Sequence, residues 1–236
     1  MGCSPQEKDT FVKLFKEYKD VFAWTYGDLK TFDTSFMQHV IPLEKEAKPY
    51  QQKLHKMHPS LELLVKKELN KMLDAKIIFP VRHTQWVANL MPVRKKMETS
   101  DYVSISETWI EHHRRITIMS RLSNTFFNAS ESKMLSLLDG FSGYNQVLVS
   151  NGDQLKTTFN TKWSTYAYRK MSFGLINAGT TFQRAMDIAF WVFINRSIVA
   201  YMDDIIVYSY HRRDHIYHLK YIFERCQRYG ISLNHK

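Results

Sequence analysis

The stretch Ser197-Ile-Val-Ala-Tyr-Met-Asp-Asp-Ile-Ile-Val-Tyr-Ser209 decides the fold, because two apolar arms flank the paired acids Asp203 and Asp204. β-Branched and aromatic residues dominate both arms, and that composition favours strands. Asp tolerates turn geometry, so the pattern predicts a hairpin with carboxylates at its tip. Paired acids are common at turns, and this stretch alone does not separate a catalytic pair from a solvated one.

Composition narrows the class of protein. The 236 residues carry a formal net charge of +10, and 44% of them are hydrophobic. These values suit a folded chain with a polyanionic partner such as nucleic acid, although basic surfaces also serve solubility or anionic membranes. Cys3 and Cys226 lack metal-ligand spacing and suit a reducing compartment. The start of the chain has no signal-peptide core, and no apolar run is long enough to span a bilayer.

Hydrophobic periodicity predicts an α+β chain of antiparallel strands backed by helices. Helices are expected over 9–22, from Ser60 onward, from about 180 to Phe193, and over 212–229, where Gly230 forms the C-terminal cap. Residues 25–52 are interpreted as a linker or a surface strap, and 97–128 as a basic loop without a strand or helix signature. Strands are predicted over 77–80, 86–93, 134–139, 156–160, 164–170 and the two arms of the acid hairpin.

A third acid, Asp139, ends the strand predicted over 134–139, so it could lie beside Asp203 and Asp204 in one sheet. Clustered carboxylates raise one another's pKa unless cations intervene, and Mg²⁺ prefers oxygen ligands. Two such ions, about 3.5–4 Å apart, can activate an attacking 3′-hydroxyl and stabilise a leaving pyrophosphate. The same spacing is compatible with three solvated acids at strand ends.

Three segments resemble, in order and spacing, the reverse transcriptases of gypsy-type LTR retrotransposons, in a plant-like form. They are Leu137-Leu-Asp-Gly-Phe-Ser-Gly-Tyr-Asn-Gln146, Lys170-Met-Ser-Phe-Gly-Leu-Ile-Asn-Ala-Gly-Thr-Thr-Phe-Gln-Arg184 and Tyr201-Met-Asp-Asp-Ile-Ile-Val-Tyr-Ser209. Tyr18-Lys-Asp-Val-Phe-Ala-Trp24 and Phe79-Pro-Val-Arg-His-Thr-Gln-Trp-Val-Ala-Asn89 look like the region that precedes and enters the fingers. The likeness covers nearly the whole chain except 97–128.

The resemblance implies a palm-and-fingers polymerase fold with an antiparallel palm sheet. It implies an RNA-directed DNA polymerase that uses two Mg²⁺ ions, with Mn²⁺ as a substitute, an RNA or DNA template with a primer, and dNTPs. Residues 1–52 would precede a reverse transcriptase domain at 53–236, with fingers at about 53–133 and 147–177 and a palm at about 134–146 and 178–236. The thumb, connection and RNase H domains of the family are expected to be absent, and the location implied is a cytoplasmic element particle.

The resemblance also implies roles for individual residues. Asp139, Asp203 and Asp204 would be the catalytic, metal-binding carboxylates, with the carbonyl of Gly140 close by. Tyr144 would lie under the deoxyribose and exclude a 2′-hydroxyl, although core packing explains it equally well. The remaining residues expected to contact nucleotide, template or primer are Phe173, Gly174, Gln183, Met202, Lys95, Lys96 and Lys236.

The chain departs from the family between residues 97 and 128. A fingertip hairpin and a strand of the type R-x-C-V-D-F-R are expected after the basic run Arg94-Lys-Lys96, and neither is evident in the sequence. If each codon is split so that its third base joins the next two, the same residues permit GDIRLCVDFRDLDRASPKDNY. We therefore hypothesise two compensating frameshifts, which replace the arginine that grips the triphosphate and bring Asp101 near its place.

Three functions remain open on the sequence. The first is an RNA-directed DNA polymerase fragment impaired by its out-of-frame fingers segment. The second is a catalytically inactive nucleic-acid-binding remnant that keeps the basic surface. The third is an RNA-templated RNA polymerase, against which Tyr144 and the Phe173-Gly-Leu motif argue.

Overall fold

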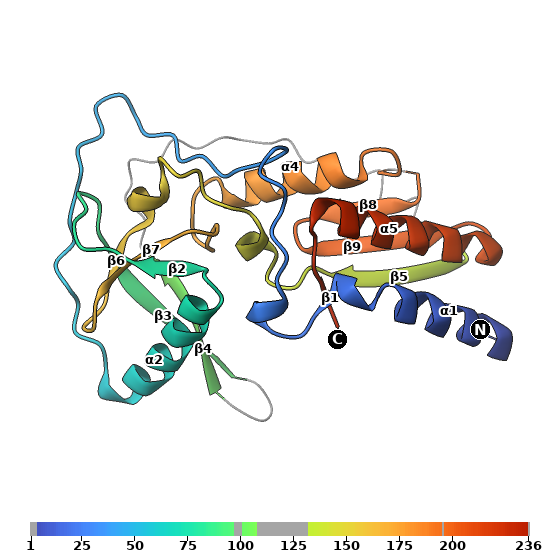
Figure 1. Ribbon diagram of the computed structural model, residues 1–236, viewed down its shortest axis with the longest axis horizontal. Coiled ribbons are helices and arrows are strands. Elements are labelled where there is room, and N and C mark those ends of the chain that lie inside the picture. The colour runs from blue at the N-terminus through green and yellow to red at the C-terminus, as the bar shows by residue number, and fades with distance from the viewer. Residues whose placement is uncertain (1–3, 97–100, 108–131, 195, 236) are drawn as a thin grey trace. The chain divides into compact units, whose positions relative to one another are not determined.

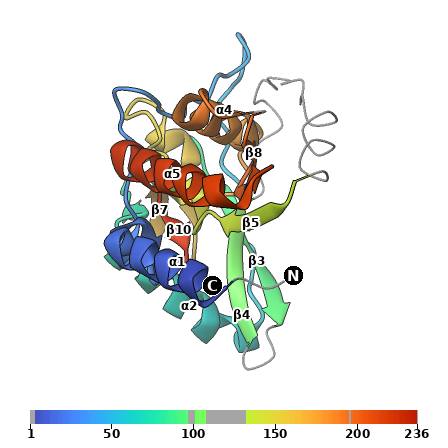
Figure 2. The same cartoon turned by 90° about the vertical axis from the view of Figure 1, so that its right-hand side faces the viewer.

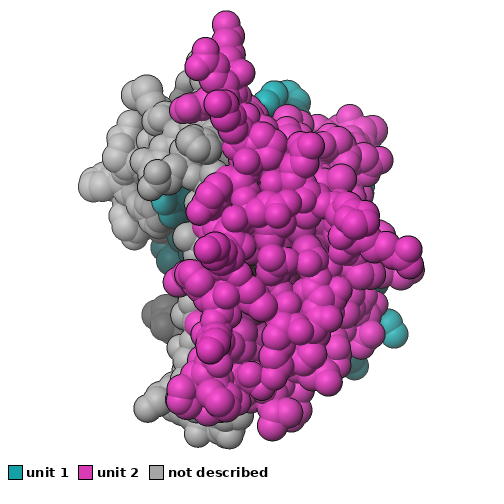
Figure 3. All heavy atoms as spheres, turned by 90° about the vertical axis from the view of Figure 1, so that its left-hand side faces the viewer, with its two compact units in different colours: residues 1–33, 118–146, 182–236 teal, residues 34–117, 147–181 magenta. Residues whose placement is uncertain are grey.

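The computed structural model describes residues 4–96, 101–107, 132–194 and 196–235, and it describes 93–96 and 101–107 by their backbone alone. The chain divides into two units, and each unit is discontinuous in sequence (Figure 3). The first unit comprises 1–33, 118–146 and 182–236, and the second comprises 34–117 and 147–181.

A three-stranded antiparallel sheet forms the centre of the first unit. Its strands are β5 (Met134–Asp139), β8 (Ile198–Tyr201) and β9 (Asp204–Ser209), and they lie in the order β5-β9-β8. The acid hairpin and the strand over 134–139 are therefore confirmed. β9 is the middle strand, and its first residue, Asp204, pairs with Asp139 of β5 and with Tyr201 of β8.

Two helices accompany this sheet. α4 (Ala178–Phe190) ends before Phe193, so the predicted apolar stripe is one turn shorter than expected. α5 (His215–Tyr229) packs on β9 and runs along it in red in Figure 1. The guanidinium of Arg225 on α5 donates to the carbonyl of Ala189 on α4 at 2.6 Å, which joins the two helices.

The N-terminal segment is part of the same unit. α1 (Pro5–Glu17) begins four residues earlier than predicted, because Ser4 caps it and Pro5 suits its first turn. It also ends earlier, since the chain turns through Lys19–Val21 into the short strand β1 (Phe22–Ala23). β1 pairs in parallel with β10 (Leu233–Asn234) at the other end of the chain.

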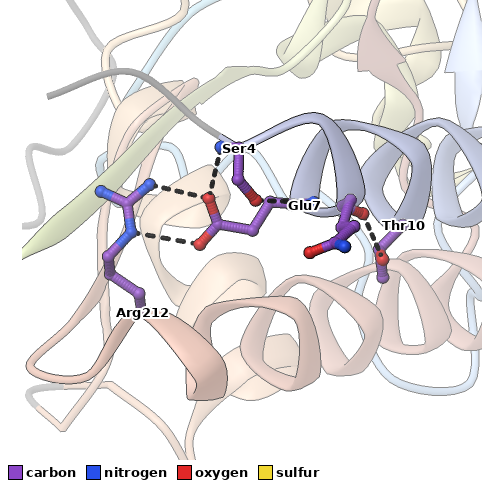
Figure 4. A network of polar contacts seen from close by, with 5 residues as sticks. Ser4, Glu7, Thr10 and Arg212 are labelled. Carbon is purple, nitrogen blue, oxygen red and sulfur yellow. Dashed lines mark hydrogen bonds and ion pairs between the residues drawn. The ribbon is translucent and has the colours of Figure 1, made fainter.

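α1 lies beside α5 (Figure 2). The rings of Phe15 and Tyr18 pack on Phe223 of α5, at 5.5 and 5.7 Å between centroids. At the start of α1, Arg212 donates from Nε and Nη2 to the two carboxylate oxygens of Glu7, at 3.2 and 3.1 Å (Figure 4). Arg212 and the hydrogen bonds of Ser4 hold the pKa of Glu7 at about 2.

The second unit contains a five-stranded sheet in the order β2-β7-β6-β3-β4. α2 (Pro59–Asp74) begins one residue before the predicted start and buries Val65, Leu69 and Met72. The strand predictions over 77–80, 86–93 and 164–170 are confirmed with shifted ends. The strand predicted over 156–160 is wrong for its first half, because Gln154–Thr157 form a 3-10 helix and only Phe159–Asn160 are extended. The strands are β2 (Ile78–Pro80), β3 (Ala88–Lys96), β4 (Asp101–Glu107), β6 (Phe159–Asn160) and β7 (Thr165–Tyr168).

The prediction of no regular structure from 97 to 128 is wrong for Asp101–Glu107. This segment is β4, and it pairs antiparallel with β3 from Lys96↔Asp101 to Leu90↔Glu107. Val103 and Ile105 alternate with serines, a period of two that the charged surroundings obscured. The backbone of a hairpin therefore does follow Lys96. Residues 97–100 and 108–131 lie outside the described residues, and they include most of the segment 97–128 that the proposed frameshifts would alter.

Residues 34–52 form a strap on the second unit, as the sequence analysis allowed. The backbone N–H of Ile41 donates to Asp153 Oδ2 at 3.0 Å, and Lys156 Nζ bridges Asp153 Oδ1 and the carbonyl of Ile41. The earlier part of the predicted linker differs, because Phe32 is fully buried in the first unit. The two cysteines do not pair in the described structure: Cys226 is free and buried, and Cys3 lies outside the described residues.

Within the described ranges, no helix combines the length and apolarity that crossing a bilayer requires.

Replacing Gly230 by alanine should destabilise the first unit. Gly230 ends α5 with φ +69°, and a Cβ there would lie 2.5 Å from the carbonyl oxygen of Thr31. We expect a loss of about 2 kcal/mol, or roughly 4–8 °C in melting temperature. The control is Gly152→Ala, which places its Cβ in open space. Equal melting temperatures for the two variants, measured by calorimetry, would contradict this account of the cap.

Candidate active site

The turn of the acid hairpin is strained. Tyr201 pairs with Asp204, so Met202 and Asp203 are its two central residues. Met202 has φ +53°, and Asp203 is not among the residues with positive φ. A positive φ at the first central residue alone is typical of a type II′ turn, a position that favours glycine. A methionine persists there only if its surroundings fix the turn.

Gln183 on α4 holds the backbone of this turn with its side-chain amide. Its Oε1 accepts from the backbone N–H of Met202 at 3.0 Å, and its Nε2 donates to the carbonyl of Ala200 at 3.0 Å. The same Nε2 also donates to Asp187 at 3.0 Å. The amide of Gln183 therefore clamps the hairpin from the helix side.

Tyr144 holds the side chain of Met202, the residue with the strained backbone. Its hydroxyl donates to the sulfur of Met202 at 3.2 Å, and its ring packs edge-on against Phe182 at 5.4 Å. Burial, followed by the nearby charge of Asp203, raises the pKa of the Tyr144 hydroxyl. Tyr144 thus lies between the hairpin and α4 with its hydroxyl at the turn.

The register of the sheet places Asp139 opposite Asp204. The two residues are direct partners at the end of the β5–β9 ladder. Side chains directly opposite each other have Cβ atoms about 4.5–5.5 Å apart. The backbone N–H of Gly140 donates to the carbonyl of Asp203 at 2.7 Å, which joins the end of β5 to the turn.

Asp203 is the most buried of the three acids. Its Oδ1 is buried without a hydrogen-bond partner among the described residues. A Cβ on Gly143 would collide with that oxygen and with the ring of Phe182, so only glycine fits beneath the carboxylate. Burial, followed by the charges of Asp139 and Asp204, raises the pKa of Asp203 to about 6.

One polar partner of the acids was missed by the sequence analysis. Asn234, on β10, donates from Nδ2 to Oδ2 of Asp139 at 2.9 Å. The two residues are 95 positions apart in sequence, and no local pattern around Asn234 indicates a carboxylate partner. Only the pairing of β10 could have revealed it.

The structure brings seven of the predicted site residues together in the first unit: Asp139, Gly140, Tyr144, Gln183, Met202, Asp203 and Asp204. Phe173 and Gly174 are exposed residues of the second unit, where Gly174 adopts φ +96°. Lys95 and Lys96 lie on β3, also in the second unit, with side chains outside the described residues, and Lys236 is likewise outside them.

The donor set suits a hard divalent cation. A buried carboxylate oxygen without a partner and two neighbouring carboxylates carry negative charge that a cation would offset. As the side chains stand, no group of three or more His, Cys, Asp or Glu residues in the described ranges is arranged to hold a metal ion. The chemistry of the donors therefore fits, and their convergence would require rotation of the side chains.

The fold and the acids define a class: a hairpin that presents two acids beside a strand ending in a third is the palm arrangement of polymerases. Residues 45–236 match the family model described as "Reverse transcriptase (RNA-dependent DNA polymerase)". The chain belongs to this family. The expected family and the α+β palm-and-fingers fold are confirmed, and the gypsy-type subclass stays a prediction.

Similar proteins come from mobile elements, plants and viruses. The chain is 26% identical over 247 residues to the retrovirus-related Pol polyprotein of transposon 412 from Drosophila melanogaster, covering 97% of this chain and 19% of that protein. It is 32% identical over 127 residues to an RNA-directed DNA polymerase homolog of Oenothera berteroana, covering 52% of this chain and 87% of that protein. The chain thus spans about a fifth of the Drosophila polyprotein and most of the Oenothera protein.

Solved structures show the same fold. The foamy viral protease-reverse transcriptase in complex with an RNA/DNA hybrid superposes with a TM-score of 0.85 at 14% identity, covering 99% of this chain and 31% of that one. The native prototype foamy virus protease-reverse transcriptase gives a TM-score of 0.82 at 15% identity, covering 98% of this chain and 30% of that one.

The pKa of Asp203 predicts how its removal affects stability. The folded state binds this proton more tightly than the unfolded chain, whose ordinary value is 3.8. Ionised Asp203 therefore opposes folding above about pH 6, and the cost disappears below about pH 4. In buffer free of divalent cations at pH 7.5, Asp203→Asn should raise the melting temperature by roughly 3–6 °C, or about 1–2 kcal/mol after allowance for its partial exposure.

The control for this experiment is Asp9→Asn, because Asp9 is exposed on α1. Melting temperatures should be compared from pH 4 to 8 in the presence of a chelator. The gain from Asp203→Asn should shrink toward pH 4. A lower melting temperature for Asp203→Asn throughout this range would contradict the assignment of a buried, repelled carboxylate.

Proposed function

We propose that this chain is the fingers-and-palm part of an RNA-directed DNA polymerase of a retrotransposon, which extends a primer on an RNA or DNA template with dNTPs. The observation that carries the proposal is the meeting of Asp139, Asp203 and Asp204 at one end of an antiparallel sheet. In this proposal the first unit is the palm, and the second unit provides the fingers.

The three carboxylates would hold Mg²⁺, or Mn²⁺ in its place, with the carbonyl of Gly140 nearby. Two bound ions would supply activation of the primer 3′-hydroxyl and neutralisation of charge on the phosphates. The chain's own contribution is three hard carboxylate donors at one end of the sheet, which would converge on the ions by rotation of their side chains. Burial, followed by the charges of Asp139 and Asp204, raises the pKa of Asp203 to about 6. Asp203 is therefore still mostly ionised at neutral pH, and its negative charge would be offset by a bound divalent cation.

Nucleotide selection would rest on residues near the turn. Tyr144 is held against Met202, and a ring in this position would exclude a ribose 2′-hydroxyl. Phe173, Gly174, Lys95 and Lys96 would contribute from the second unit. Support for a nucleic acid partner comes from the net charge of +10 and from the foamy viral relatives, which were solved with double-stranded DNA and with an RNA/DNA hybrid.

We further propose that polymerase activity in this copy is impaired by the segment 97–128. The β3–β4 pairing preserves a hairpin backbone, so the impairment lies in the side chains that the altered reading frame supplies. Asp101, the first residue of β4 and next to the connecting segment, would repel a triphosphate where the family carries an arginine. A cytoplasmic location rests on the family resemblance alone.

The alternative is an inactive remnant that binds nucleic acid. The observation that favours it is the absence of a converged metal-binding group in the described residues. Such a protein would keep salt-dependent binding to duplexes but would not turn over nucleotides.

Primer extension on poly(rA)·oligo(dT) with Mg²⁺ tests the proposal. The four proteins to compare are the chain itself, its Asp203→Asn variant, a version with 97–128 restored to the shifted reading frame, and the restored version carrying Asp203→Asn. We expect strong extension only from the restored protein, because it regains the arginine and keeps the three acids. Asp203→Asn introduced into the restored protein should reduce extension by about 10²-fold or more, in line with losses of transition-state charge stabilisation.

Three outcomes would overturn parts of the proposal. Extension by the unmodified chain that depends on Asp203 would show that 97–128 is a tolerated fingertip. Absence of primer extension by the restored protein, with duplex binding retained, would favour the inactive remnant. Incorporation of ribonucleotides at a comparable rate would instead indicate an RNA-templated RNA polymerase.

A further inference from the structure

We propose that the N-terminal segment, residues 4–33, positions an active-site carboxylate: Trp24 and β1 hold β10 in place, and Asn234 of β10 orients Asp139. This inference rests on the proposed function in one respect, the role of Asp139 as a cation-binding acid. The segment precedes the region 45–236 that matches the reverse transcriptase family model.

The contact that matters functionally is the one between Asn234 and Asp139. Asp139 is exposed at the end of β5, so packing restrains its carboxylate little and a hydrogen bond can set its orientation. The side-chain amide of Asn234 donates to Oδ2 at 2.9 Å, which fixes one oxygen and leaves Oδ1 to face a cation. Hydrogen bonds of this kind to ligating carboxylates set their orientation and are worth about 10–100-fold in metal affinity.

β10 is too short to hold itself in place, since it has two residues. On one side, Leu233 bridges to Gly140 at the end of β5. On the other side, Leu233 and Asn234 pair with Phe22 and Ala23 of β1. The position of Asn234 therefore depends on residues at the start of the chain.

Further hydrogen bonds tie the approach to β10. The backbone N–H of Ser232 donates to Oε1 of Gln146 at 2.7 Å, and the hydroxyl of Ser232 accepts from the N–H of Lys30 at 3.0 Å. Lys30 belongs to the N-terminal segment. Ser232 therefore bonds two residues that are distant from it in the sequence, one through its backbone and one through its side chain.

Trp24 adds a stacking contact directly beside Asn234. Its ring lies 3.8 Å from the ring of His235 with an interplanar angle of 21°. His235 Nδ1 is 3.2 Å from the carbonyl of Ala23, so ring and backbone are held together. Trp24 is 67% exposed, so hydrophobic burial does not account for its position. The stack on His235 does.

The backbone before and after Trp24 is fixed independently of β10. Asp28 accepts from the N–H groups of Trp24 and Thr25 at 3.1 and 2.8 Å. On the preceding side, the ring of Phe22 packs on Phe223 of α5 at 5.5 Å. The backbone around Trp24 is therefore held by contacts other than those with β10, as a positioning role for Trp24 requires.

Two measurements test the inference on the full chain. The first is hydrogen exchange of residues 231–235 in metal-free buffer, comparing Trp24→Ala with Trp191→Ala. Trp191 is 70% exposed and directly follows α4, so it is a control of the same residue type and similar exposure. We expect exchange of 231–235 to quicken by about 10-fold or more in Trp24→Ala and to stay unchanged in Trp191→Ala.

The second measurement is Mn²⁺ binding, followed by the loss of the free-ion signal in electron paramagnetic resonance. Asn234→Leu removes the donor and keeps a side chain of similar size. It should weaken Mn²⁺ binding by about 10-fold with the melting temperature unchanged, an outcome that a merely structural role would not produce. Asp203→Asn serves as the reference for loss of the proposed cation site.

The outcomes separate this inference from the proposed function. Unchanged exchange in Trp24→Ala, or unchanged Mn²⁺ affinity in Asn234→Leu, overturns the positioning role while the polymerase proposal stands. Absence of Asp203-dependent Mn²⁺ binding in the unmodified chain contradicts the proposed cation site and, with it, the role of Asn234. The exchange result still decides whether Trp24 holds β10, because it is measured without metal.

Discussion

The burial of Asp203 beside two other carboxylates, at one end of a sheet, is the constraint on which the surrounding contacts of the first unit depend. Asp139 faces Asp204 across a ladder pair. Asp203 lies on the turn between β8 and β9, and one of its oxygens is buried and lacks a hydrogen-bond partner within the described part of the chain. Such an arrangement costs free energy in the absence of a cation, as the raised pKa of Asp203 shows. The surrounding structure must therefore hold in place a cluster that would otherwise relax.

That support comes from several elements, and each contributes a specific contact. Gln183 clamps the strained backbone at Met202, and Tyr144 holds the methionine side chain. Gly143 leaves room for the carboxylate of Asp203, a close approach that no other residue permits. On the opposite side, Asn234 fixes Asp139 from a short strand that the N-terminal segment completes. The strain stored at the turn is thus offset by packing and hydrogen bonds drawn from the whole length of the unit.

The sequence predicted the features that are local in the chain. The acid hairpin, β5 and α5 with its Gly230 cap follow from alternation, helical periodicity and cap chemistry within short windows. The strand β4 was missed because Val103 and Ile105 are too few to stand out among charged and polar neighbours. The bond from Asn234 to Asp139 was missed because it depends on the pairing of β1 with β10, residues about 200 positions apart that no local pattern relates. The role of Gln183 at the turn likewise depends on packing of α4 that periodicity does not specify.

The central claim is that Asp139, Asp203 and Asp204 form one divalent-cation site. Anomalous diffraction from crystals grown with Mn²⁺ tests it most directly, because manganese is located independently of any assumption about activity. We predict an anomalous peak within about 2.5 Å of carboxylate oxygens of Asp203 and of Asp139 or Asp204, with Asp139 still bonded to Asn234. Manganese found only elsewhere, with these three carboxylates unliganded at saturating Mn²⁺, would contradict the account.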